Sequence, residues 1–330
     1  MRTLVARLDG DGDVLLAGPA VRAAAAAGEV VLLCGPSGAQ AGELLPGVTR
    51  VLRWECPWIA WPAPPTRPAE VEAVVRMIRD ARVDVALLLT SFHQSPLPLA
   101  LLTRLAGVPR VVARSVDYPG SLLDVRLRDD PDVPEAERAL EVARAAGFEL
   151  PPGDDGRLAV RTPPEPDLTG PYVVVHPGAT APARTWSPDR CAAAVVALAR
   201  AGHRVVVTGG PGETDLTARV AGTAGLDLGG RTTFAELAGV LAHADAVVVG
   251  NTGPAHLAAA VGTPVVSLFA PVVPARRWAP HGRHVLLGDQ HAPCRDSRAR
   301  DCPVPGHPCL DRVTPAEVVA AVDRLVGVRA

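Results

Sequence analysis

The sequence predicts an α/β protein made of two Rossmann-like units, each a parallel sheet flanked by helices. Segments typical of strands and helices alternate along nearly the whole chain, as they do in parallel sheets. The alternation restarts after a proline-rich stretch, and 330 residues are enough for two cores. Because 48% of the residues are hydrophobic but only 3% aromatic, Ala, Val and Leu must fill those cores.

The first unit, residues 1–150, begins with a strand and continues the alternation. Its predicted strands are Thr3–Leu8, Glu29–Leu33, Val48–Leu52, Val83–Leu89 and Arg110–Ala113. Its predicted helices are Val14–Ala27, Ala69–Ala81 and Leu97–Ala106. Residues 151–170 are rich in proline and acidic residues, which predicts a linker between the units.

The second unit, residues 171–330, repeats this pattern. Its predicted strands are Tyr172–His176, Arg204–Thr208, Asp245–Val249 and Pro264–Phe269. Its predicted helices are Pro188–Ala201, Glu213–Gly222, Phe234–Ala242, Ala255–Val261 and Pro315–Val326. The two units share an architecture without a convincing sequence period, so no repeat of the solenoid kind is expected.

Composition excludes several classes of function. A formal net charge of −2 argues against nucleic acid as an electrostatic partner. No apolar run approaches the eighteen residues of a membrane span, and the first residues begin a strand rather than a signal peptide. We therefore expect a cytoplasmic protein.

Four polar loops follow predicted strands, and ligands of open α/β sheets bind beyond the carboxyl ends of the strands. The loops are Asp9–Asp13, Pro177–Thr180 with Arg184 beyond it, Gly209–Glu213 and Gly250–Gly253. Polar loops on two facing sheets predict a cleft between the units that holds a ligand with a negatively charged middle.

The most informative loop is the run from Gly250 to Gly253, which leads from a buried strand into an alanine-rich helix with Pro254 in its first turn. The N–H groups at such a helix start bind anions, most often phosphate. An ordinary capped turn would look the same, so the other three loops decide between the two interpretations.

The acidic loop Asp9–Asp13 has three alternatives. A calcium-binding EF-hand requires Gly and Glu where Val14 and Ala20 stand, which excludes it. A dinucleotide-binding fingerprint is disfavoured because its third glycine is replaced by Leu15. A structural role for Asp13, capping a helix that begins at Val14, is compatible with a catalytic one.

Taken together, these motifs resemble glycosyltransferase family 9, the ADP-heptose-dependent heptosyltransferases. The resemblance spans nearly the whole chain in the order and spacing of the family. It rests on Gly12–Leu16 with Pro19, His176–Gly178, Val207–Gly210 with Glu213, Asn251–Pro254 with His256, and Pro264 with Phe269. It implies a GT-B fold, with the acceptor on the first domain, the nucleotide sugar on the second, and no metal or other cofactor. In this fold the last helix, 315–326, commonly crosses back to the first domain.

The resemblance also implies roles for individual residues. Asp13 stands where the family has the catalytic base, which deprotonates the acceptor hydroxyl as it attacks the anomeric carbon from the face opposite the diphosphate. The configuration is then inverted. A carboxylate suits this task, because it also stabilises an oxocarbenium-like transition state.

On the donor side, the resemblance assigns residues to the departing diphosphate and the nucleotide. Arg184 stands at the family's basic residue, often a lysine, and keeps its charge. Glu213 matches an acid that contacts the nucleotide through its ribose hydroxyls, although an acid in a first helical turn is also favoured by the helix dipole alone. The other predicted donor-binding residues are Thr180, Gly209, Gly210, Asn251, Thr252, Gly253 and His256. His256 also has a purely structural interpretation, as a packed or capping histidine.

Asn251 departs from the family, several members of which carry an acid there that helps to grip the donor sugar. An amide donates as well as accepts, so the donor stays open between ADP-heptose and another nucleotide sugar, with an ADP-sugar favoured. The acceptor is a glycan, glycolipid or small molecule, and a lipid-linked one would bring the protein to a membrane surface. The aromatic loop with Trp54, Trp58 and Trp61 either stacks on that acceptor or packs within the loop.

Six cysteines are scattered along the chain, and a cytoplasmic setting favours free thiols. Cys294, Cys302, His307 and Cys309 lack the paired spacing of common zinc modules, so no metal site is predicted. The sequence thus favours an inverting, metal-independent glycosyltransferase. A GT-B-like sugar-nucleotide 2-epimerase and a non-catalytic nucleotide-sugar-binding protein are the alternatives.

Overall fold

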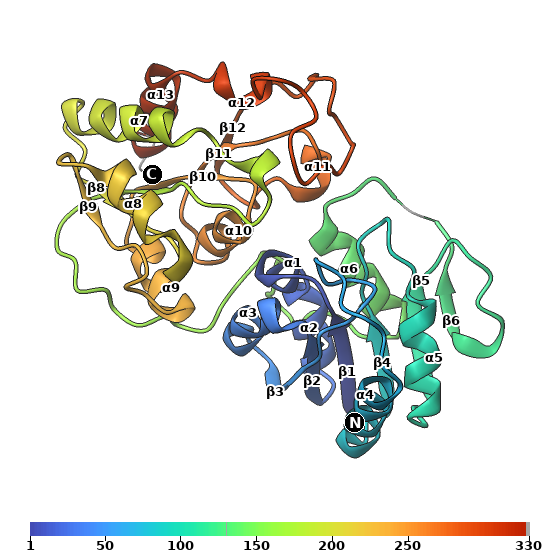
Figure 1. Cartoon of the computed structure of the whole chain (residues 1–330). Helices are drawn as coiled ribbons and strands as arrows, with labels where there is room; N and C mark the ends of the chain where they lie inside the picture. The colour runs from blue at the N-terminus through green and yellow to red at the C-terminus, as the bar shows by residue number, and fades with distance from the viewer. Residues whose placement is uncertain (130, 328–330) are drawn as a thin grey trace. The chain divides into compact units, whose positions relative to one another are not determined.

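The computed structural model describes residues 1–129 and 131–327. The chain divides into two compact units, Met1–Arg161 and Thr162–Ala330, and the division falls within the proline-rich stretch 151–170. Each unit contains one six-stranded sheet in which every pair of neighbours is parallel (Figure 1). The predicted α/β fold class is therefore confirmed.

The first sheet has the strand order β3-β2-β1-β4-β5-β6. Its strands are β1 (Arg2–Arg7), β2 (Glu29–Cys34), β3 (Val48–Arg53), β4 (Val85–Leu88), β5 (Arg110–Arg114) and β6 (Val125–Leu127). Its helices are α1 (Asp11–Leu16), α2 (Gly18–Ala25), α3 (Ala39–Leu44), α4 (Pro68–Ala81), α5 (Leu97–Leu105) and α6 (Glu135–Ala145), with 3-10 turns η1 (Pro36–Gly38) and η2 (Gly120–Leu122).

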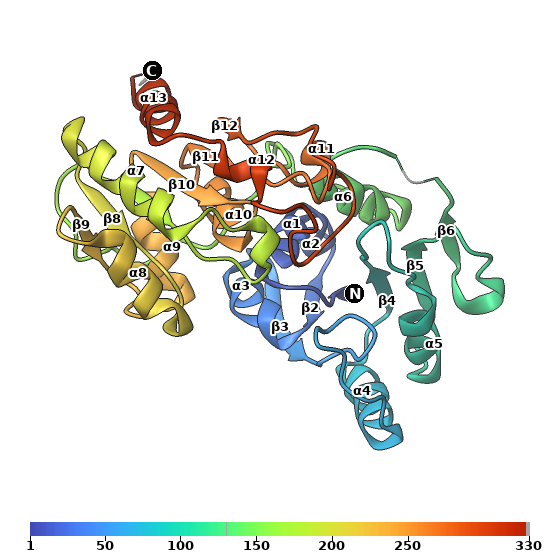
Figure 2. The ribbon, with the colours of Figure 1, turned by 45° about the horizontal axis from the view of Figure 1, so that its top comes forward.

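The two faces of the first sheet are covered by different helices (Figure 2). α4 packs beside α5, and their apolar residues form one core with Leu4 and Ala6 of β1. α2 packs beside α6. Because side chains alternate along a strand, Arg7 points away from the core that holds Leu4 and Ala6, and its guanidinium contacts Glu135 of α6.

The second sheet has the order β12-β11-β10-β7-β8-β9. Its strands are β7 (Val173–His176), β8 (Val205–Val207), β9 (Gly225–Asp227), β10 (Ala246–Gly250), β11 (Val265–Leu268) and β12 (His284–Leu287). Its helices are α7 (Pro188–Arg200), α8 (Thr214–Ala221), α9 (Phe234–Ala242), α10 (Gly253–Ala260), α11 (Ala275–Trp278), α12 (Pro308–Asp311) and α13 (Pro315–Val326), with 3-10 turns η3 (Pro182–Arg184) and η4 (Pro211–Glu213).

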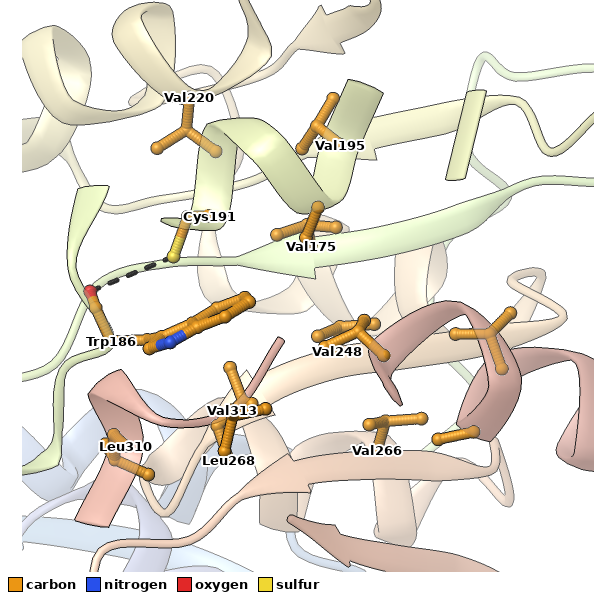
Figure 3. Packing of buried hydrophobic residues seen from close by; sticks show 14 of the residues in the cluster. Val175, Trp186, Cys191, Val195, Val220, Val248, Val266, Leu268, Leu310 and Val313 are labelled. Carbon is orange, nitrogen blue, oxygen red and sulfur yellow. Dashed lines mark hydrogen bonds between the residues drawn. The ribbon is translucent and has the colours of Figure 1, made fainter. Parts of the chain in front are cut away.

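One face of the second sheet carries a core built almost entirely from small aliphatic side chains (Figure 3). Valines of four strands meet α7, α8 and α13, and Trp186 is the large residue among them. The Cys191 thiol donates a hydrogen bond to the Trp186 carbonyl, 3.8 Å from sulfur to oxygen. This contact fixes the start of α7 against the chain segment that leads from β7.

Several predicted elements differ from the structure. The predicted helix Val14–Ala27 is two helices, α1 and α2, because Gly18 and Pro19 open a new first turn after Leu16. The N-cap of α1 is Gly10, so the prediction that Asp13 caps a helix beginning at Val14 is wrong. Strands β6, β9 and β12 escaped prediction, because short edge strands carry no continuous buried run.

Helix α6 also escaped prediction, because its buried positions include charged residues that interrupt the apolar pattern. Helices α9 and α13 match their predicted bounds. α13 packs against α7 within its own unit, and its predicted crossing to the first domain stays a prediction. Among the residues that the structure describes, no helix is long and apolar enough to span a membrane.

Candidate active site

Each sheet has one switch point, where the connections that follow two neighbouring strands run toward opposite edges of the sheet. Ligands of doubly wound folds bind at such points. In the first sheet it lies between β1 and β4, and in the second between β7 and β10. The predicted catalytic residue Asp13 follows β1. Arg184 and Asn251 follow β7 and β10, so the topology brings the predicted residues to the switch point of their own unit.

In the first unit, the guanidinium of Arg7 contacts two aspartates of the acidic loop. Its Nη2 donates to Oδ1 of Asp13 at 2.6 Å and to Oγ of Ser91 at 2.8 Å. Its Nε lies 2.9 Å from Oδ2 of Asp9, and its Nη1 lies 3.7 Å from Oε2 of Glu135. Arg7 is buried, with 3% of its side chain exposed, whereas Asp13 keeps 28% of its side chain exposed.

The three aspartates of this loop differ in their surroundings. Asp9 is held on its other side by Gln94, whose Nε2 donates to Oδ1 of Asp9 at 2.6 Å. Burial raises the pKa of Asp9, Arg7 opposes that change, and the charge of Asp13 adds to it. Asp11 points elsewhere: it accepts the Ala41 N–H at 3.1 Å, and burial raises the pKa of its carboxyl to about 6.

In the second unit, a glycine allows two loops to meet. A β-carbon at Gly250 would lie 2.6 Å from the carbonyl oxygen of Arg184, so only glycine lets η3 rest on the end of β10. The Nη1 of Arg184 then lies 3.5 Å from the carbonyl oxygen of Asn251. The predicted cation thus stands beside the turn that starts α10. Thr180, on the same loop, is exposed to solvent.

The turn between β10 and α10 is fixed by the side chain of Asn251. Its Nδ2 donates to the carbonyl oxygen of Ala270, and its Oδ1 accepts the Ala270 N–H, both at 3.2 Å. The residue is 5% exposed. The predicted sugar-facing amide is therefore paired with backbone that follows β11.

The helix start differs in detail from the prediction. α10 begins at Gly253, with Thr252 as N-cap and Pro254 as its second residue. The Thr252 N–H donates to the carbonyl oxygen of Gly250 at 2.9 Å, so it is paired within the turn, and its role as an anion ligand stays a prediction. The N–H of Gly253 makes no hydrogen bond to any described residue. His256 is buried one turn into the helix.

In the Gly209–Glu213 loop, the Glu213 carboxylate accepts a hydrogen bond from the backbone of the same loop. Oε2 of Glu213 accepts the Gly210 N–H at 2.7 Å and lies 4.0 Å from Nε2 of His176. Nδ1 of His176 and Oγ1 of Thr208 lie 3.0 Å apart. Burial lowers the pKa of His176, and Glu213 opposes that change. Glu213 is the last residue of η4 and α8 starts after it, so the acid belongs to the loop rather than to the helix.

Four residues of the first cluster escaped sequence analysis: Arg7, Ser91, Gln94 and Glu135. An arginine that directly follows the apolar run Leu4–Ala6 was the available signal for Arg7, because a buried cation must meet acidic partners. Ser91 and Gln94 follow β4, the strand that lies beside β1 in space but not in sequence. That neighbourhood depends on the strand order.

The late cysteines lie near one another in the second unit. Burial raises the pKa of the Cys309 thiol to about 12, and the neighbouring thiols of Cys294 and Cys302 add to this change. His307 is turned to the backbone, with its Nε2 3.1 Å from the carbonyl oxygen of Ala183. Over residues 1–129 and 131–327, no three His, Cys, Asp or Glu side chains are arranged to hold a metal ion.

Comparison with known proteins identifies the family. A model of glycosyltransferase family 9 (heptosyltransferase) matches residues 71–306, more than half of the chain. The chain belongs to glycosyltransferase family 9. It is similar to lipopolysaccharide heptosyltransferase 3 of Escherichia coli at 34% identity over 164 residues, and to the protein of that name from strain K12 at 38% over 104 residues. These matches cover 47% and 30% of the chain and the same shares of the two relatives, less than half of each.

Solved family 9 structures share the fold over nearly the whole chain. The family 9 glycosyl transferase of Veillonella parvula has a TM-score of 0.75 at 17% identity and covers 98% of this chain and 97% of its own. ADP-heptose lipopolysaccharide heptosyltransferase II of Escherichia coli has a TM-score of 0.72 at 20% identity, covering 99% and 98%. Heptosyltransferase WaaC of Escherichia coli, solved with ADP, also has 0.72 at 22% identity, covering 98% and 100%. The predicted GT-B fold is confirmed.

Proposed function

We propose that this family 9 member is an inverting, metal-independent glycosyltransferase that moves a sugar from a nucleotide diphosphate sugar to an acceptor hydroxyl. Asp13 is the general base. The single observation that carries the proposal is the Asp13 carboxylate, half-buried after β1 at the switch point of the first sheet and bonded to a buried arginine. A fixed, partly solvated carboxylate is suited to accept a proton from a hydroxyl group.

The chemistry of the acceptor follows from that carboxylate. As the acceptor oxygen forms its bond to the anomeric carbon, its proton passes to Asp13. The bond from the anomeric carbon to the diphosphate oxygen breaks on the opposite face, and the electron pair leaves with the diphosphate. The configuration at the anomeric carbon is inverted by this single displacement.

The leaving diphosphate gains negative charge, and two features of the second unit suit it. Arg184 supplies a permanent cation with a fork that matches phosphate oxygens. The start of α10 supplies the Gly253 N–H and the positive end of the helix dipole. Charge complementarity of this kind stabilises the transition state without a metal ion. Thr180, exposed on the loop that leads to Arg184, offers a hydroxyl to the same phosphates.

Glu213 suits the nucleotide ribose. Its Oε2 is occupied by the Gly210 N–H, while its Oε1 makes no hydrogen bond to the described residues. A carboxylate fixed by one oxygen presents the other as a directed acceptor for a hydroxyl group. Gly209 and Gly210 let the backbone run close to this carboxylate, and His256 supports the neighbouring helix start from within.

We propose an ADP-sugar, with ADP-heptose favoured, as the donor. WaaC has been solved with ADP and with ADP-2-deoxy-2-fluoro heptose, which supports an adenine nucleotide in this family. Asn251 then acts on the sugar indirectly, since its amide holds the β10–α10 turn through Ala270. The acceptor is a glycan, glycolipid or small molecule, and the names of the curated relatives favour a lipopolysaccharide acceptor.

The experiment begins with a panel of nucleotide diphosphate sugars, scored by thermal stabilisation of the full chain, because tight ligands raise apparent stability. We expect ADP-heptose to stabilise most. Turnover with an acceptor panel is then followed by mass spectrometry, and the anomeric configuration of the product by NMR. We expect inversion and unchanged rates in EDTA.

Three other results would contradict the proposal. Conversion of a sugar nucleotide in the absence of any acceptor would indicate a 2-epimerase. Affinity for a sugar nucleotide without turnover by any acceptor would indicate a binding protein. A product with retained configuration would exclude a direct displacement assisted by Asp13.

A further inference from the structure

Arg7 is a buried charged side chain with several charged and polar partners in the first unit. It ends β1 and lies within reach of three carboxylates from three segments: Asp9 after β1, Asp13 in α1 and Glu135 at the start of α6. Ser91, from the loop after β4, accepts a hydrogen bond from the same Nη2 that holds Asp13. One buried cation thus ties three other segments to the helix that carries the proposed base.

The arrangement gives Arg7 a fixed orientation. Glu135 is 1% exposed and Arg7 3% exposed, so neither side chain can turn to solvent. Burial lowers the pKa of Arg7, but Asp9, Asp13 and Glu135 together raise it above its usual value, so the guanidinium stays charged. Reorienting a buried cation that has several anionic partners costs free energy, because each alternative rotamer leaves a charge unpaired.

We propose that Arg7 is the positioning residue of the transfer reaction: its Nη2 fixes the Asp13 carboxylate, while Asp9 and Glu135 fix the guanidinium. This inference rests on the proposed function of Asp13. The contact of 2.6 Å between Nη2 and Oδ1 is short for a charge-assisted hydrogen bond, and such bonds hold a carboxylate in one orientation. Reaction rates depend steeply on the orientation of a base.

The same geometry places a cation directly beside the Asp13 carboxylate. An opposite charge at this distance favours the ionised form of a carboxyl group. Asp9 acts in the other direction, because it shares the Arg7 cation and adds a negative charge nearby. Asp9 and Asp13 therefore influence each other's ionisation, while Arg7 stays charged.

Other charged groups lie near these three residues. Glu135 and Arg138 of α6 and Arg114 of β5 line one small cavity together with Arg7, and α1 also carries Asp11. Arg138 lies 3.8 Å from Glu135, and Arg114 is paired with Asp129 and Glu141. Asp11 is turned to the Ala41 N–H. Arg7 contacts Asp13 directly, at 2.6 Å.

The test measures kcat/KM for transfer against pH in the full chain, since the acidic limb of that profile reports the base of the free enzyme. Arg7→Lys keeps the charge but loses the fork, so it cannot hold Asp9 and Asp13 together. We expect its acidic limb to move up by about one pH unit. At pH values below the acidic limb, kcat/KM for transfer should fall about tenfold, while the affinity for the nucleotide sugar stays unchanged.

Asp9→Asn should shift the acidic limb of the pH profile in the opposite direction. It removes one competing negative charge, so Arg7 stabilises ionised Asp13 more strongly and the acidic limb moves to lower pH. The control is Arg22→Met, which removes another partly buried ion pair of this unit, with Asp154 at 2.6 Å, and should leave the limb in place. Opposite shifts for the two variants cannot come from a general loss of stability.

The outcomes separate this inference from the proposed function. If Arg7→Lys and Asp9→Asn both keep the wild-type limb while Asp13→Asn is inactive, Arg7 does not position the base and the proposed function stands. If Asp13→Asn transfers at the wild-type rate, the proposed function itself fails. Should Arg7→Lys not fold, the shift of Asp9→Asn alone decides: movement to lower pH supports the inference, and an unchanged or raised limb overturns it.

Discussion

The carboxylate of Glu213 occupies the space that a β-carbon on Gly178 would need, with Oε1 only 1.9 Å from that position. The loop after β7 and the loop after β8 therefore meet through a glycine and an acid. Glycine is required at position 178 by the neighbouring Glu213 side chain, because the backbone of Gly178 does not adopt a left-handed conformation. The acid is the residue proposed to contact the ribose.

Gly178→Ala should displace Glu213 without unfolding the protein, because the obstructing atoms lie at the end of a flexible side chain. The displaced carboxylate loses the Gly210 N–H, and the affinity for the nucleotide sugar should fall by about tenfold, the equivalent of one charge-assisted hydrogen bond. Titration calorimetry with ADP measures this. Gly212→Ala is the control, because a β-carbon there meets no atom within 4 Å. Equal affinities for the two variants would refute a role for Glu213 in binding.

Asn251→Asp should destabilise the fold rather than change the donor. An ionised carboxylate cannot donate to the Ala270 carbonyl oxygen and would be buried against it, at a cost of about 1–3 kcal/mol. Urea unfolding measures the loss. A variant of unchanged stability that instead prefers another sugar nucleotide would show that this side chain faces the ligand.

Asp11 should make stability depend on pH. Burial raises the pKa of its carboxyl to about 6, above the usual value of 3.8, so the folded chain holds this proton more tightly than the unfolded chain. The free energy of unfolding contributed by Asp11 is therefore full below about pH 4. It falls as the pH rises to 6, by at most about 3 kcal/mol.

Asp11→Asn should flatten that dependence, because an amide does not titrate and still accepts the Ala41 N–H. Urea unfolding between pH 4 and 7 compares the two proteins. Asp80→Asn, on the exposed side of α4, serves as the control and should keep the wild-type slope. If Asp11→Asn also kept that slope, burial of this carboxyl would not be the cause.

The sequence was sufficient to predict the strands and helices that depend on local pattern. Continuous apolar runs predicted the central strands, and the capping residues Thr233 and Thr314 accompany helices whose predicted bounds are correct. The family motifs also predicted which loops carry the polar residues. Edge strands such as β6 were missed, because they are short and only half-buried.

Contacts between distant segments could not be predicted in the same way. Arg7 meets Ser91 and Glu135 only because β1 lies beside β4 and because α6 returns to the same face of the sheet. The Asn251 amide pairs with the Ala270 backbone, which follows a different strand, while its role toward the donor stays a prediction. No local pattern in the sequence marks either relationship.

The most direct test of the central claim is transfer by Asp13→Asn, assayed with an ADP-sugar and an accepted acceptor. The amide keeps the shape of the side chain but cannot take the acceptor proton, so turnover should fall by about 10²–10⁴-fold, while ADP binds as in the wild-type protein. Turnover at the wild-type rate would contradict the assignment of Asp13 as the base.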